Sequence, residues 1–247
     1  MATQLEINLL SETDVSAIDT AAQILQTNHG SIAYEKLVLA LGADQIRPPL
    51  AGNAVAEVIT VNDLEDYAQF QNAIEGKKRI AILGAGLIGC EFANDLVLGG
   101  YEVDVIDLAP QVLGRLLPEA AAKALQAKLS DAGVRWHFST TAQSIDRAGD
   151  SLVISLANGN SIACDVVLSA IGLKPRVGLA KAAGIKTGAG IAVNRELQTS
   201  ANNVYSLGDC AEVEGLVLPY VMPIMQAARA LAPTLLGQVT TLSYPAM

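Results

Sequence analysis

A run of glycines in mid-chain has the spacing of a nucleotide-binding turn. Residues 79–89 are RIAILGAGLIG, a short apolar strand followed by the pattern G-x-G-x-x-G. In this pattern the first glycine permits a tight turn, the second lets the backbone approach a pyrophosphate, and the third lets the next helix pack closely on the strand. The free N–H groups and positive dipole end of that helix favour phosphate. We expect the dinucleotide to contact five residues here: Gly84, Gly86, Leu87, Ile88 and Gly89.

Two aspartates compete for the ribose of that dinucleotide. Asp104 lies 20 residues after Gly84, and Asp107 lies 23 residues after it. Asp104 falls inside the next predicted strand, whereas Asp107 falls at its carboxyl end, where open α/β sheets bind ligands. We therefore predict that Asp107 accepts hydrogen bonds from a 2′-hydroxyl and repels a 2′-phosphate, which favours NAD over NADP. The alternative is that Asp107 only ends the strand. Arg115 is interpreted as a solvated loop charge.

The segments around these residues alternate between strand and helix. We predict strands at 79–83, 101–107 and 134–138, with helices at about 87–98 and near 118–132. This βαβαβ order is typical of a doubly wound unit of parallel strands. The composition, 51% apolar but only 4% aromatic, suits tightly packed α/β layers. The predicted fold class is α/β, with a Rossmann-like domain.

The chain also contains an internal repeat. Residues 31–42 (SIAYEKLVLALG) align with residues 161–172 (SIACDVVLSAIG) at a constant offset of 130. Chance similarity between two apolar strands would explain the Val and Leu positions but not the run of identical residues. Each copy is expected to form a β meander followed by a buried strand that ends in glycine, at Gly42 and Gly172. In the second copy Asn158-Gly159 supplies a hairpin turn. If the copies are equivalent, a first glycine motif belongs roughly 46 residues before Met1. The chain is therefore expected to begin inside its first nucleotide-binding domain.

A second signature lies near the end of the sequence. A short predicted strand, NVYSLG, ends in Gly208-Asp209. A helix with Pro223 in its first turn then continues to about Leu236. Alone, Gly-Asp is only a turn signal, but here it follows a Rossmann unit and precedes a helix.

Together these stretches resemble the flavoproteins with two dinucleotide-binding domains, the pyridine nucleotide–disulfide oxidoreductase superfamily. GAGLIGCE is similar to its NAD loop, and SLGDCAE is similar to its second FAD motif. The resemblance implies the cofactors FAD and NAD, and it implies that Asp209 beside Gly208 binds the ribityl chain of FAD. It further implies that the helix beginning near Val221 points at the flavin ring, and that Gly172 closes the NAD domain beside the cofactor.

Glu91 matches the acid that the family places beside the nicotinamide. We predict this role for it, with one alternative left open: an acid in the first turn of a helix is stabilised by the helix dipole alone.

Within the superfamily, GAGLIGCEFANDL and GDCAEVEGLVLPYVMP resemble the bacterial rubredoxin–NAD reductases. This narrower resemblance implies an FAD-dependent NADH oxidoreductase that passes electrons singly to rubredoxin, for alkane hydroxylation. It also implies a domain plan in which an NAD-binding domain with a β meander, residues 76–173, is inserted in an incomplete FAD-binding domain formed by residues 1–75 and 174–247. The first FAD loop and the C-terminal domain of the family are expected to lie outside this sequence.

Two other functions stay open. One is a plain NAD-binding module without redox activity. The other is a disulfide reductase whose cysteine pair belongs to the absent N-terminal part, since Cys90, Cys164 and Cys210 are scattered and are expected to be buried thiols.

Charge and hydropathy restrict the partners. The formal net charge of −9 disfavours nucleic acid and anionic membranes. No apolar run reaches the ~18 residues of a membrane span, and no secretory signal is recognised, so we expect a cytoplasmic protein. His29 and His137 show no metal-ligand pattern, and we predict no metal site. An acidic rubredoxin would need a basic patch for docking. Residues 77–79 form the only compact one, unless they are simply a solvated loop.

Overall fold

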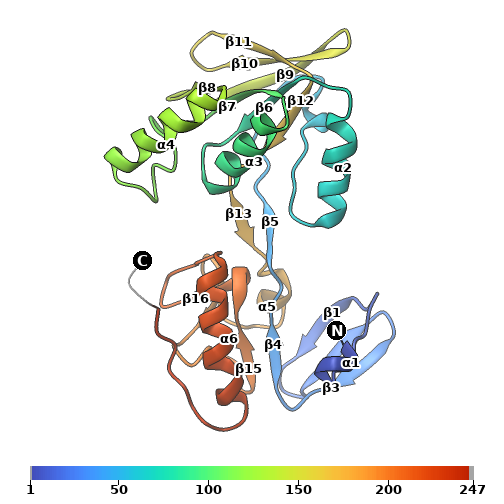
Figure 1. Ribbon diagram of the computed structural model, residues 1–247. Helices are drawn as coiled ribbons and strands as arrows, with labels where there is room; N and C mark the ends of the chain where they lie inside the picture. The colour runs from blue at the N-terminus through green and yellow to red at the C-terminus, as the bar shows by residue number, and fades with distance from the viewer. Residues whose placement is uncertain (1, 245–247) are drawn as a thin grey trace. The chain divides into compact units, whose positions relative to one another are not determined.

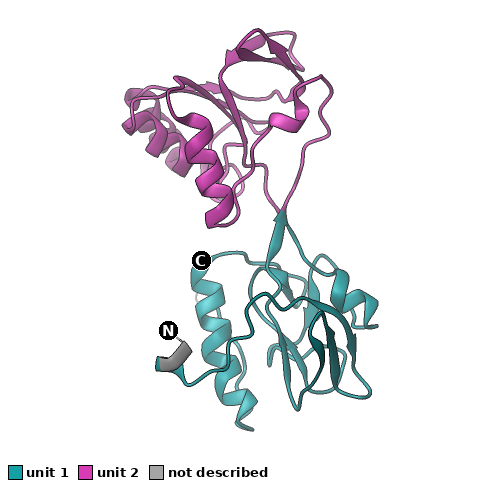
Figure 2. Cartoon of the chain, turned by 90° about the vertical axis from the view of Figure 1, so that its right-hand side faces the viewer, with its two compact units in different colours: residues 1–44, 174–247 teal, residues 45–173 magenta. Residues whose placement is uncertain are grey.

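The computed structural model describes residues 2–244, and the chain forms two compact units (Figure 2). Unit 1 consists of residues 1–44 and 174–247, and unit 2 consists of residues 45–173. Unit 2 is thus inserted in the sequence of unit 1. Within the described residues, no helix is long and apolar enough to cross a membrane.

Unit 2 is built on a parallel sheet of four strands in the order β12-β6-β7-β8 (Figure 1). The strands are β6 (Arg79–Leu83), β7 (Glu102–Ile106), β8 (Val134–His137) and β12 (Val166–Ser169). Helix α3 (Leu87–Leu98) connects β6 to β7, and α4 (Glu119–Ala132) connects β7 to β8. The predicted βαβαβ unit and its α/β fold class are confirmed, with each predicted element within two residues of its observed bounds.

Strands β6 and β12 are buried on both faces of this sheet, which is why they are largely apolar. Alternate residues point to opposite faces. Ile80 and Ile82 join the core beneath the helices, whereas Ala81 and Leu83 join the core beneath a β meander. That meander consists of β9 (Ala142–Ala148), β10 (Ser151–Leu156) and β11 (Ser161–Cys164), all antiparallel. The predicted turn at 158–159 joins β10 to β11.

The N-terminal limit of unit 2 differs from the predicted boundary at residues 75 and 76. Residues 45–75 belong to unit 2 and contain the 3-10 helix η1 (Val55–Glu57) and helix α2 (Leu64–Ile74). Phe70 and Ile74 are buried in the core on the helical face of the sheet, and the Phe70 ring meets Phe92 edge-on at 5.4 Å. This burial joins α2 to unit 2. Unit 2 ends at residue 173, and the chain returns to unit 1 at residue 174.

Unit 1 contains the first meander, formed by β1 (Val15–Asp19), β2 (Ile24–Thr27) and β3 (Gly30–Ala33). Two parallel pairs follow, β4 (Leu37–Leu39) with β15 (Val204–Ser206) and β14 (Ile191–Val193) with β16 (Ala211–Val213). The short helices are α1 (Ala2–Leu5), α5 (Gly178–Ala182) and η2 (Gly208–Cys210). Helix α6 (Val221–Leu235) packs on one face of the β4–β15 pair through Ala227, Ala230 and Leu231. Strands β5 (Ala43–Gln45) and β13 (Leu173–Pro175) pair with each other where the chain passes between the units.

The predicted repeat is visible in the structure. Residues 31–42 form the end of β3 and then β4, and residues 161–172 form β11 and then β12. Each copy is a three-stranded antiparallel meander that leads into a strand of a parallel pairing.

Candidate nucleotide-binding sites

The glycine turn follows β6 directly and can be built only with glycine at two of its positions. Gly84 has a φ of +107°, and a Cβ there would lie 2.5 Å from the carbonyl oxygen of Ala170. A Cβ on Gly89 would lie 2.0 Å from the carbonyl oxygen of Gly84. The turn is therefore pressed between the first turn of α3 and the segment after β12, which leads to Gly172 at a φ of +124°.

The outer side of the same turn is open. Gly86 is the N-cap of α3, has no side-chain hydrogen bond, and its Cβ position has no atom within 4 Å. Leu87 and Ile88 are exposed at 42% and 37%. The first N–H groups of a helix have no partner inside the helix. Gly86, Leu87, Ile88 and Gly89 therefore present N–H groups and a positive dipole end to whatever approaches, which suits a pyrophosphate.

Asp107 lies one residue beyond β7 and holds the glycine turn in place. One carboxylate oxygen accepts a hydrogen bond from the N–H of Ala85, and the other accepts one from the N–H of Ala109 at 2.7 Å. A carboxylate has about four lone-pair positions, so further acceptor capacity remains for ribose hydroxyls. The alternative that Asp107 only ends a strand is incomplete, because its side chain joins the turn to the loop after β7.

Asp104 has a different task. Its carboxylate is buried and accepts hydrogen bonds from Arg135 at 2.7 and 3.0 Å, and Nε2 of His137 lies 2.8 Å away. Burial alone would raise the pKa of the Asp104 carboxyl, but the hydrogen bonds and positive charges of Arg135 and His137 outweigh it and lower that pKa. Asp104 thus belongs to an ion network between β7 and β8. Arg115 is exposed in the loop after Asp107.

Glu91 is exposed on α3 and is the fifth residue of that helix. The first turn of α3 contains no acid, so the alternative of a first-turn acid held by the helix dipole does not apply. Its neighbour Cys90 is buried, and burial followed by the charges of Asp107 and Glu91 raises the pKa of the Cys90 thiol to about 11.

The second candidate site is in unit 1, where β15 ends. Gly208 has a φ of +79°, which a glycine adopts readily, and it opens the short helix η2 that carries Asp209. The Oδ1 atom of Asp209 is buried and has no hydrogen-bond partner among the described residues. A buried carboxylate oxygen without a donor is costly. Asp209 can therefore accept a hydrogen bond from a donor that approaches this turn.

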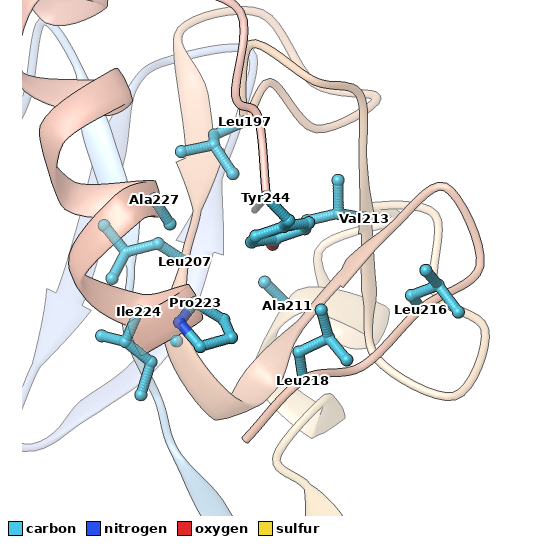
Figure 3. Close-up of a pocket in the computed structure, with 11 residues that line it drawn as sticks. Leu197, Leu207, Ala211, Val213, Leu216, Leu218, Pro223, Ile224, Ala227 and Tyr244 are labelled. Atoms are coloured by element: carbon cyan, nitrogen blue, oxygen red, sulfur yellow. The ribbon is translucent and has the colours of Figure 1, made fainter. Parts of the chain in front are cut away.

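Helix α6 begins close to this turn. An apolar pocket lined by Gly208, Pro223, Ile224 and Ala227 lies between the start of α6 and the turn, and Tyr244 packs into it (Figure 3). The N-cap of α6, Tyr220, makes no side-chain hydrogen bond, and Val221 is 74% exposed. The positive end of α6 is thus free to face an anionic or electron-rich ligand. Pro223 is the third residue of α6, near its predicted place in the first turn.

The basic stretch at 77–79 is largely neutralised within unit 2. Lys78 forms an ion pair with Glu102 at 3.0 Å, and Arg79 forms one with Asp165 at 2.6 Å. Within residues 2–244, no group of three or more His, Cys, Asp or Glu side chains is placed to hold a metal ion.

Comparison with known proteins identifies the family. Residues 2–232 match the pyridine nucleotide-disulphide oxidoreductase family. The chain belongs to this family. The predicted superfamily is confirmed, and with it the Rossmann-like architecture.

Two curated members of the family are similar along the whole chain. The Rubredoxin-NAD(+) reductase of Alcanivorax borkumensis is 49% identical over 248 residues, and that of Acinetobacter baylyi is 48% identical over 255 residues. Each match covers 100% of this chain and 65% of the relative, so the chain spans 65% of the length of these proteins.

Two solved structures share the fold. The ferredoxin reductase for the CYP199A2 system from Rhodopseudomonas palustris has a TM-score of 0.93 and 33% identity, over 99% of this chain and 62% of its own. The reductase in the covalent putidaredoxin reductase–putidaredoxin complex has a TM-score of 0.90 and 27% identity, over 98% of this chain and 61% of its own.

The anchors of the two turns could not be predicted from the sequence. The Ala85–Asp107 hydrogen bond joins residues 22 apart. Ser206 and Cys210 bond to Leu39 at the end of β4, and Cys210 also bonds to Leu41 just after it, 167 to 171 positions earlier. No periodic pattern marks such pairs. The family resemblance, which implied one domain formed by residues 1–75 and 174–247, was the signal that β4 and the later strands share a core.

Proposed function

We propose that this chain is the nucleotide-binding part of an FAD-dependent NADH oxidoreductase that passes electrons from NADH through flavin to a small redox protein, with rubredoxin as acceptor. The names of the two curated relatives and of the two solved structures support this assignment. The bound FAD supplies the redox chemistry, since it takes two electrons as hydride and releases them one at a time. The protein binds and orients the two cofactors.

NADH is assigned to unit 2. The N–H groups of Gly86, Leu87, Ile88 and Gly89 bind the pyrophosphate, and Asp107 accepts hydrogen bonds from the adenosine ribose. Glu91 is assigned to the nicotinamide end, and Gly172, in the segment after β12, is assigned to the cofactor site. Support comes from the open approach to Gly86 and from the fixed position of Asp107 beside Ala85.

FAD is assigned to unit 1, and the observation that carries the redox function is the buried, unpartnered Oδ1 of Asp209. The hydroxyl groups of a ribityl chain are the donors that this oxygen lacks. Gly208 lets the backbone turn beside it, and the exposed start of α6 at Val221 faces the flavin ring. A plain NAD-binding module has no use for this arrangement.

The thiols do not favour a disulfide-exchange activity for this chain. All three cysteines are buried and free. Burial raises the pKa of Cys90 to about 11 and that of Cys164 to about 12, so neither is a ready nucleophile near neutral pH. Reduced, buried thiols suit the cytoplasm, and we propose that location.

The identity of the electron acceptor is the part of this proposal that the structure supports least. Lys77 is exposed, but Lys78 and Arg79 are engaged by Glu102 and Asp165. Only a weak, salt-sensitive attraction of an acidic rubredoxin to this stretch is expected. Reduction of rubredoxin and of a plant-type ferredoxin by NADH, followed by absorbance, compares the two acceptors directly.

Titration of the two cofactors tests the proposal. The purified 247-residue chain is titrated separately with NADH and FAD, with Asp209→Ala beside Glu35→Ala, an exposed carboxylate of the same unit, as control. We expect Asp209→Ala to weaken FAD binding at least tenfold, with NADH affinity unchanged and Glu35→Ala neutral. If Asp209→Ala binds FAD as tightly as wild type, FAD does not bind at Asp209. NADH binding without any FAD binding leaves this 247-residue chain as an NAD-binding module, since the first FAD loop is expected to lie outside its sequence.

A further inference from the structure

Cys210 is fully buried and lies at the centre of a polar cluster between β4 and the Gly208–Asp209 turn. Its Sγ accepts a hydrogen bond from the N–H of Leu41 at 3.2 Å. The same Sγ lies 3.4 Å from the carbonyl oxygen of Leu207 and 3.5 Å from that of Leu39, either of which accepts the thiol proton. The thiol therefore links the end of β4 to the turn that carries Asp209.

Ser206 completes this cluster. It is also fully buried, its hydroxyl donates to the carbonyl oxygen of Leu39 at 2.9 Å, and it lies 3.5 Å from Cys210 Sγ. The N–H of Leu207 donates to the same carbonyl at 3.2 Å. Ser206 and Cys210 flank Gly208-Asp209, so both ends of the turn are fastened to one strand end. The residues between them, Leu207, Gly208 and Asp209, are partly exposed.

We propose that Cys210, assisted by Ser206, is a positioning residue that fixes the Gly208–Asp209 turn on the end of β4 and so aims the Asp209 carboxylate at its ligand. The proposal rests on the proposed function in naming FAD as that ligand. The hydrogen-bonded cluster of Ser206 and Cys210 with the end of β4, called the lock below, is present in the protein without cofactor. The unpartnered Oδ1 of Asp209 is its consequence, because a turn free to relax would rotate that oxygen toward water.

A purely space-filling role for Cys210 predicts something different. If only volume mattered, valine would replace the thiol well, since it is similar in size and apolar. If the hydrogen bonds matter, valine leaves the Leu41 N–H without an acceptor, whereas serine restores a donor and an acceptor. Cys210→Val and Cys210→Ser therefore separate the two roles. Cys210→Ala is a second apolar variant, in case valine prevents folding.

The first measurement needs no cofactor. Backbone amide hydrogen exchange is compared in wild type and variants at residues 39–41 and 206–211. We expect exchange to rise at least tenfold in both segments for Cys210→Val and Cys210→Ala, and to stay within threefold of wild type for Cys210→Ser. Wild-type exchange in the apolar variants overturns the lock. So does a serine variant that exchanges as fast as valine.

The second measurement is the dissociation constant of FAD, with circular dichroism as a check on folding. Cys210→Val should bind FAD at least tenfold more weakly, Cys210→Ser within threefold of wild type, and NADH affinity should not change. Cys164→Val is the matched control, since Cys164 is a similarly buried thiol in unit 2. Equal FAD affinity in all variants overturns the positioning role. A wild-type chain that binds no FAD contradicts the proposed function instead, and the exchange data then decide the lock by themselves.

Discussion

The two copies of the repeat begin from similar sequences and acquire different neighbours. In the second copy Asp165 accepts hydrogen bonds from the backbone N–H groups of Lys78 and Arg79, and from the side chains of Arg79 and Ser151. These bonds fasten β12 to the start of β6. In the first copy the equivalent residue is Glu35, which is exposed. The repeat therefore specifies a meander and a strand, while single side chains determine what the strand is fastened to.

The strand edges show the same difference. Leu168 of β12 forms a parallel bridge with Ile59, and β6 pairs along the other edge. The equivalent residue of β4, Val38, pairs with Tyr205 of β15. Strand β15 thus takes the place of Ile59. Among residues 2–244, no strand pairs with the β4 edge that corresponds to the β6 side. One repeat consequently serves two sites, a glycine turn beside β12 and a Gly-Asp turn beside β4.

The largest predicted effect tests whether the two turns differ in the room that they leave for a side chain. Gly89→Ala places a Cβ 2.0 Å from a backbone oxygen, and we expect it to lower the free energy of unfolding of unit 2 by about 3 kcal/mol. Gly208→Ala meets no atom within 4 Å and should cost about 1 kcal/mol, for its positive φ alone. Urea unfolding is followed by the fluorescence of Trp136, the single tryptophan, for unit 2 and by circular dichroism for the whole chain. Equal losses of unfolding free energy in the two variants would show that the two turns leave the same room for a side chain.

The second prediction concerns the anchors of the two copies. The Arg79 hydrogen bond, aided by the backbone N–H groups of Arg79 and Lys78, outweighs burial and holds the pKa of Asp165 at about 2. An unfolded aspartate titrates near ~3.9. Because the folded pKa is the lower one, the stability that Asp165 contributes is fully present above about pH 4 and is lost as the pH falls toward 2. Asp165→Asn should therefore lower the melting temperature at pH 7 and have little effect near pH 2.

Glu35→Gln is the matched control for this pH series. Since Glu35 is exposed, its substitution should leave the melting temperature unchanged at every pH. The proposed difference is that Asp165 anchors its copy whereas Glu35 does not. It is contradicted if Glu35→Gln lowers the melting temperature as much as Asp165→Asn does, or if the effect of Asp165→Asn persists at pH 2.

Much of this architecture could be predicted because it depends on local patterns. Apolar strands, the glycine spacing and the helix limits of α3 follow from the sequence within a residue or two. The attachment of α2 could not be predicted, because it depends on Phe70 and Ile74 filling a core built largely by later residues. The cluster around Cys210 was also missed, since a buried thiol looks the same in sequence whether it fills space or bonds to a distant strand. Long-range polar pairs leave no periodic trace.

The third prediction addresses the open side of the glycine turn. Gly86 has a φ of −74°, which valine also adopts, and its Cβ position is free of contacts. Gly86→Val should thus preserve folding, as judged by circular dichroism. It should still weaken NADH binding at least tenfold, about 1.4 kcal/mol, by blocking the approach of the pyrophosphate. An unchanged NADH affinity would mean that the turn is structural only.

The smallest predicted effect concerns the choice between nucleotides, where the anchoring role of Asp107 has a consequence of its own. NADH should bind wild type more tightly than NADPH, because the carboxylate accepts from the 2′-hydroxyl and repels a 2′-phosphate. Asp107→Ala removes that acceptor and should weaken NADH binding about fivefold, close to the ~1 kcal/mol of one net hydrogen bond. The same substitution leaves the N–H groups of Ala85 and Ala109 without their acceptor and so loosens the turn. The NADPH affinity should therefore rise less than the loss of charge repulsion alone would predict. Asp107→Asn keeps one acceptor oxygen without the charge, so it should retain more NADH affinity than alanine while narrowing the gap between the nucleotides. Fluorescence titration of both nucleotides into the three proteins measures this, and equal affinities in wild type would exclude Asp107 as the residue that selects NAD.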